Sequence, residues 1–178
     1  MATRSFDLSR RELLKLGAGA SLALTTVGMT ATLTGCSSSQ AASDYAVLRE
    51  SDLPVLRALF PAVVGEHPAL REDSAALERA IRQLDTTLDS TSPAVQSDVL
   101  DLLGMLSLPL TRGPLTGIWG SWEKASPEAL QSFLDRWKNS RLDMLRQGYK
   151  ALGQLLLMSW YALPQSWADA GYPGPPTV

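Results

Sequence analysis

Apolar residues recur at steps of three and four along most of the chain after residue 50, and this spacing limits the fold more than any other feature. Residues at such steps line one face of an α-helix, and that face must be buried against other helices. No stretch alternates with the period of two that a half-buried β-strand requires. The sequence therefore predicts an all-α fold, a compact bundle of about five helices.

Serine before proline marks helix starts, because the serine side chain caps exposed amides and proline fits the first turn. Ser92-Pro93 and Ser126-Pro127 are such pairs. Together with the apolar spacing, these signals predict helices that begin near Ser51, Ser74, Ser92 and Ser126, and a longest helix over 141–163. Pro61 is expected to kink or end the first helix. Residues 107–125 are rich in proline and glycine and predict either a short helix or a long ordered loop.

The last predicted helix is apolar nearly all round from Ala151 onward. Such a helix is buried either in the core or against a second chain, and the sequence leaves both open. An ordered tail of proline, glycine and large aromatic residues is predicted to follow it. Aromatic residues of this kind are frequent at protein interfaces. The tail therefore contacts a partner, folds back over its own helices, or does both.

The chain has one cysteine and one histidine among 178 residues, which leaves little conventional catalytic equipment. One thiol excludes an internal disulfide and a multi-thiolate zinc site. The lone His67 argues against a histidine-centred triad, and we expect a surface or capping role for it. Dinucleotide-binding, nucleophile-elbow and calcium-loop patterns are missing, and a net charge of −2 argues against nucleic-acid binding. No catalytic, metal or cofactor-binding residue is predicted.

The first 36 residues are predicted to be an export signal rather than part of the fold. Ser9-Arg10-Arg11-Glu12-Leu13-Leu14-Lys15 is a twin-arginine pattern, with Arg10 and Arg11 as the export determinant. The apolar run that follows is diluted by glycine and threonine, which favours an export signal over a permanent membrane helix. Removing this segment takes away four of 16 basic and two of 18 acidic residues, so the remainder has a net charge of −4.

Leu33-Thr34-Gly35-Cys36 resembles a lipobox, in which a peptidase cuts before the cysteine and the thiol becomes lipid-modified. Two acyl chains on Cys36 would anchor the protein stably to a membrane. Residues 37–44 are then predicted to be a serine-rich flexible tether, and residues 45–178 the helical domain. The alternative is a conventional cut near Ala41 or Ala42 without lipid.

Three features of the chain together resemble the gluconate 2-dehydrogenase subunit 3 family. They are the twin-arginine leader, Leu59-Phe60-Pro61, and an ending that runs through Pro164 to Gly171-Tyr172-Pro173-Gly174-Pro175. Members are the small, gamma-type subunits of periplasmic FAD-dependent sugar and alcohol dehydrogenases. The resemblance implies a non-catalytic subunit that helps the FAD-bearing large subunit mature and carries it through twin-arginine export. FAD is thus expected in the partner and not in this chain.

The resemblance also implies the partners and the contact residues. The partners are the FAD-dependent large subunit and, where present, a cytochrome c subunit that accepts the electrons. The implied location is the periplasm, with a lipid anchor on the membrane. Two departures from the family are the lipobox itself and the lack of a further cysteine for an intersubunit disulfide. The rival interpretation is a stand-alone periplasmic lipoprotein with a structural or binding role. The implied contact residues are Trp160, Tyr161, Trp167, Tyr172, Pro173 and Pro175.

Overall fold

The computed structural model describes residues 40–73, 75–167 and 170–174. The chain divides into two units, residues 1–40 and a compact unit from Ala41 to Val178. The twin arginines, Cys36 and Pro175 lie outside the described residues, so the structure does not test the predictions made on them. Everything below concerns the second unit, which we call the helical domain.

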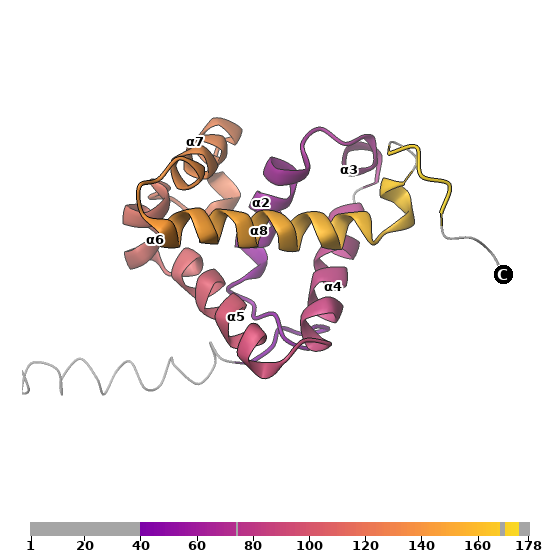
Figure 1. The fold of residues 1–178 in the computed structure, drawn as a ribbon, viewed down its shortest axis with the longest axis horizontal. Helices are drawn as coiled ribbons and strands as arrows, with labels where there is room; N and C mark the ends of the chain where they lie inside the picture. Colours follow the sequence, from indigo (N-terminus) through magenta and orange to yellow (C-terminus); the bar gives the residue numbers. More distant parts are fainter. Residues whose placement is uncertain (1–39, 74, 168–169, 175–178) are drawn as a thin grey trace, which may run out of the picture. The chain divides into compact units, whose positions relative to one another are not determined.

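The described part of the helical domain contains seven α-helices and two short 3₁₀ helices (Figure 1). Within those residues no β-strand occurs, and the predicted all-α fold is confirmed. The elements are α2 (Leu53–Val64), α3 (Pro68–Glu72), α4 (Ala76–Asp89), α5 (Pro93–Ser107), α6 (Pro109–Thr116), η1 (Trp122–Lys124), α7 (Pro127–Lys138), α8 (Asp143–Tyr161) and η2 (Pro164–Ser166). The two helices beyond the predicted five are the short α3 and α6.

The two serine–proline pairs act as helix caps. The hydroxyl of Ser92 accepts the amide of Val95 at 3.4 Å, and that of Ser126 accepts the amide of Ala129 at 3.2 Å. Each bond satisfies one of the free amides in a first turn. The predicted starts of α5 and α7 are thereby confirmed.

The first predicted helix needs a correction, and the second begins close to its predicted start. α2 begins after Asp52 rather than after Ser51, and it continues past Pro61 to Val64. Proline removes only one internal hydrogen bond, and the burial of Leu59 and Phe60 holds the helix across it. α4 begins at Ala76, close to the predicted start. Of the two alternatives predicted for residues 107–125, the short helix is the one observed, as α6.

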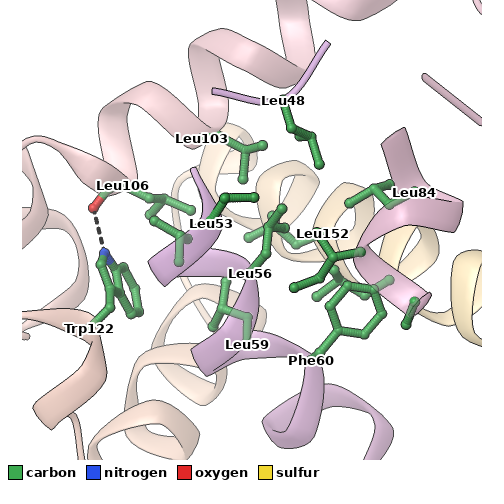
Figure 2. Close-up of a cluster of buried hydrophobic side chains, with 14 of the residues drawn as sticks. Leu48, Leu53, Leu56, Leu59, Phe60, Leu84, Leu103, Leu106, Trp122 and Leu152 are labelled. Carbon is green, nitrogen blue, oxygen red and sulfur yellow. Dashed lines mark hydrogen bonds between the residues drawn. The ribbon is translucent and has the colours of Figure 1, made fainter. Parts of the chain in front are cut away.

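α2 is the central element of the core, and it packs against α4, α5, α7 and α8. Leu56, Leu59 and Phe60 of α2 are fully buried and meet leucines from the surrounding helices (Figure 2). The ring of Trp122 closes one side, and its Nε1 donates to the carbonyl of Leu106 at 2.9 Å. Each such leucine contributes roughly 2 kcal/mol on burial.

The segment Ala41–Asp52, which we call the N-terminal segment, belongs to the helical domain. The carboxylate of Asp85 on α4 accepts the backbone amides of Ala46, Val47 and Leu48 at 2.7–2.9 Å. Asp85 is itself buried, so these charge-assisted bonds lie away from water. One side chain of α4 thus fixes the backbone of a segment nearly forty residues earlier.

A second buried carboxylate closes the same segment. Asp52 accepts the backbone amide, Nε and Nη2 of Arg49, whose guanidinium also donates to the carbonyl of Leu100 on α5. Ala42 is buried, and its amide donates to the carbonyl of Leu48. The predicted tether over 37–44 is therefore wrong for its last four residues, because the compact unit starts at Ala41.

Candidate functional site

Some titratable groups in the described residues form ion pairs, such as Arg49 with Asp52 and Arg57 with Glu78. Among those residues, no three His, Cys, Asp or Glu side chains lie close enough to hold a metal ion. Hydrogen bonds from Arg57 lower the pKa of the Glu78 carboxyl, and burial and the charge of Glu78 raise the pKa of Tyr45. None of the helices in the described ranges is long and apolar enough to span a membrane.

His67 caps α3, and capping was one of the two roles predicted for it. Its Nδ1 accepts the amide of Ala69 at 3.1 Å. The imidazole also meets the ring of Trp160 edge to face, with 4.9 Å between the ring centroids. His67 therefore links the short helix α3 to the end of α8.

A pocket of about 460 Å³ opens between α2, α3, α4 and α7. Its lining is mostly apolar, and a few polar groups sit at its edge, where Gln131 of α7 donates to the carbonyl of Ala62 at 2.9 Å. A pocket of this size and lining can take the apolar body of a small molecule or of a partner's side chain. The lining residues are Ala58, Pro61, Ala62, Gly65, Glu66, His67, Leu70, Arg71, Leu77, Pro127, Leu130 and Gln131.

The C-terminal tail, described over 162–167 and 170–174, folds back onto the end of α8 and the start of α4. Trp167 donates its Nε1 to the carbonyl of Tyr161 at 3.0 Å. The rings of Trp167 and Tyr172 meet edge to face at 5.4 Å between centroids. Gln165 accepts two bonds from Arg79 of α4, at 3.0 and 2.7 Å. The tail covers part of its own helices, as one of the two alternatives predicted.

The predicted contact residues do not all lie on the surface. Tyr161 and Tyr172 are about half exposed, at 50% and 48%, Pro173 is exposed, and Trp167 is half-buried. Trp160 is wrong as a contact residue, because its ring is fully buried among the core residues at the end of α8. Helical geometry allows the difference, since adjacent residues on a helix point about 100° apart.

The sequence analysis missed the two most exposed large apolar side chains of the described residues. Leu110 of α6 is 87% exposed, and Trp119, in the turn after it, is 77% exposed. Residues 107–125 were predicted as a short helix or a long ordered loop, and none of them was predicted as a contact residue. The sequence did offer one signal for this surface. Trp119 lies between Gly117 and Gly120 and belongs to none of the apolar stripes, so the helical core does not require it.

The comparisons with known proteins identify no relative. A scan against protein-family models finds no match, and searches of curated proteins and of solved structures find no similar chain. The class of the protein therefore follows from its own described residues, which form an all-α domain with an apolar pocket and a folded-back aromatic tail.

Proposed function

We propose that this chain is a non-catalytic accessory subunit of a periplasmic flavin-dependent sugar or alcohol dehydrogenase. It assists the maturation of the FAD-bearing large subunit and carries it through twin-arginine export. The observation that carries the proposal is the C-terminal tail, in which Tyr161 and Tyr172 are about half exposed and the ring of Tyr172 rests edge to face on that of Trp167. Rigid aromatic side chains of this kind give much contact area at a low cost in conformational entropy.

The export route gives this role its physical logic. A receptor reads the twin arginines as an address, so one leader can serve a preassembled complex that crosses the membrane folded. The small subunit then needs Arg10 and Arg11, a stable fold and a surface for its partner. A lipid on Cys36 would hold the complex at the periplasmic face of a membrane, where a cytochrome c subunit can accept electrons.

The export role is tested by changing both arginines. We expect the double variant Arg10→Lys with Arg11→Lys to leave both this chain and its flavoprotein in the cytoplasm, whereas the parent exports both. Fractionation followed by flavin absorbance of the captured complex measures this. Export of the flavoprotein in the presence of the double variant would overturn the carrier role.

The docking role is tested on the tail itself. The double variant Tyr161→Ala with Tyr172→Ala should reduce capture of the flavoprotein by roughly tenfold or more, as loss of aromatic anchors usually does. The matched control is Leu142→Ala with Met144→Ala, which changes two exposed apolar residues at the other end of α8. Equal capture by both variants would remove the tail from the interface.

A second candidate function is favoured by the pocket between α2 and α7. A stand-alone periplasmic lipoprotein could bind an apolar small molecule there. Saturable binding of a fluorescent fatty-acid analogue to the parent, lost in Ala62→Phe and kept in Ala94→Phe, would support it. A flavoprotein captured with the chain, together with no such binding, would decide for the accessory role.

A further inference from the structure

The most exposed apolar residues of the described chain lie together on α6 and the turn that follows it. A Cβ at Gly113 would lie 2.6 Å from the ring of Trp119, so this indole rests directly on α6. Leu110 precedes Gly113 by about one helical turn and therefore lies on the same face. We call Leu110, Gly113 and Trp119 the α6 ridge.

The α6 ridge is built into the fold and is not a loose loop. Gly113 is buried beneath the indole, and any side chain there would displace the ring. Gly117 ends α6 in the left-handed region at a φ of 75°, a conformation that glycine adopts without strain. The tryptophan is thus held on the helix while most of its ring stays in contact with solvent.

Basic side chains surround this ridge. Arg112 neighbours Gly113 on α6, and the guanidinium of Arg136 lies over Gly117, where a Cβ would be 2.5 Å from its Nη2. The pKa of Glu123 is lowered mainly by hydrogen bonds from its own amide and from Ser121, and also by the charges of Arg112 and Lys124. Two cations, Arg112 and Lys124, thus lie near one carboxylate, and Arg136 lies at the end of α6, in a chain whose net charge is −2.

We propose that the α6 ridge docks on an anionic lipid bilayer. Leu110 and Trp119 enter the headgroup region, and the nearby arginines and lysine lie at the lipid phosphates. Tryptophan is enriched at that depth of a membrane, and basic residues are attracted to an anionic membrane surface. A protein partner would need an apolar groove shaped to receive these two side chains. A fluid bilayer accepts a protruding leucine and indole without such a groove.

The position of α6 in the domain suits this role. α8 runs from the side of α6 and α7 to the side of α3 and the tail, so the ridge and the tail lie toward opposite ends of that helix (Figure 1). Bilayer contact through the ridge therefore leaves the tail accessible to a protein. The inference goes beyond the proposed accessory role and does not require it, because the ridge consists of this chain's own residues.

Quenching of tryptophan fluorescence by brominated lipid tests the proposal in the full chain. All five tryptophans lie at or after residue 119, so the leader contributes none. On vesicles of phosphatidylglycerol and brominated phosphatidylcholine, we expect Trp119→Phe to reduce the quenching at least about twofold, because only this indole reaches the headgroups. Trp167→Phe, which changes a half-buried indole in the tail, is the matched control and should keep the quenching.

Two further variants locate the docking surface and its charge dependence. Leu110→Ser should lower the quenching as Trp119→Phe does, and Lys124→Gln with Arg136→Gln should abolish the preference for anionic over neutral vesicles. Equal quenching in the parent and in Trp119→Phe would overturn the proposal. The proposal would also be overturned if the tryptophan fluorescence of Leu110→Ser were quenched normally while the variant no longer captured a flavoprotein. The ridge would then be a protein interface. Failure here leaves the export and capture experiments unaffected, because no vesicle assay involves the partner.

Discussion

The two terminal segments of the helical domain are held by different kinds of contact. The N-terminal segment gives three backbone amides to the buried carboxylate of Asp85. Its Arg49 pairs with the buried Asp52 of the same segment and donates to the carbonyl of Leu100 on α5. The C-terminal tail is held by neutral or exposed bonds, such as those of Gln165 and Trp167, and it keeps Tyr172 half exposed.

This difference separates a structural role from a surface role. Hydrogen bonds to a buried charge are about twice as strong as neutral ones, and losing the charge strands every donor around it. The N-terminal segment is therefore part of the fold. The tail can change without unfolding the domain, which suits a contact surface.

The largest expected effect lies at the boundary between core and tail. Trp160→Ala should lower the free energy of unfolding by about 3–5 kcal/mol, because the ring is fully buried and its loss leaves a cavity. Tyr161→Ala, one residue further on and half exposed, should lower it by only about 0.5 kcal/mol. Denaturant unfolding of both variants measures the difference. Similar losses in the two variants would place the core boundary elsewhere.

The next effect tests the hold on the N-terminal segment. Asp85→Ala should lower the free energy of unfolding by about 3 kcal/mol, because three backbone amides lose their charged acceptor. It should also open the segment 41–52 to protease before the helices unfold. Asp89→Ala, an exposed carboxylate one turn further along α4, is the control and should stay within about 0.5 kcal/mol of the parent. If Asp85→Ala leaves the segment resistant to protease, Asp85 is not what holds it.

Local patterns in the sequence predicted the helices better than they predicted the segments between them. Ser92 and Ser126 mark their helices because a cap and a first-turn proline act within four residues. The bonds of Asp85 join residues 37–39 positions apart, and no local pattern encodes such a pairing. For the same reason residues 41–44 were predicted as tether, although Ala42 is buried.

Predicting the contact surfaces required knowing which side of its helix each residue lies on. The sequence shows that residues 151–163 are apolar nearly all round, but it cannot show that Trp160 faces inward while Tyr161 faces out. Trp119 was visible as an aromatic in an irregular stretch. Its exposure follows from the short α6 beneath it, whose contact with the indole at Gly113 only the folded chain reveals.

A smaller effect is expected from the tail's own anchor. Trp167→Ala removes the indole on which Tyr172 rests and the bond to the carbonyl of Tyr161. Because the ring is only half-buried, we expect a loss of about 1 kcal/mol in the free energy of unfolding, with a much larger loss of flavoprotein capture. Unfolding curves and capture yields from one preparation compare the two. A variant with normal capture would show that the tail does not dock.

The smallest expected effect is a pH dependence of stability that involves the N-terminal segment and not the tail. Glu78 of α4 pairs with Arg57 and accepts a hydrogen bond from Tyr45 of the N-terminal segment, and its pKa is lowered from its usual value of 4.5, chiefly by the bond from Arg57. A lowered pKa stabilises the fold above about pH 4.5, and that contribution is lost as the pH falls through the lower folded value. The pair is partly exposed, so screening keeps the contribution below about 1 kcal/mol. Thermal unfolding from pH 6 to pH 3 should therefore show a shallower acid loss in Glu78→Gln than in the parent, and parallel curves would show that Glu78 does not couple the N-terminal segment to pH.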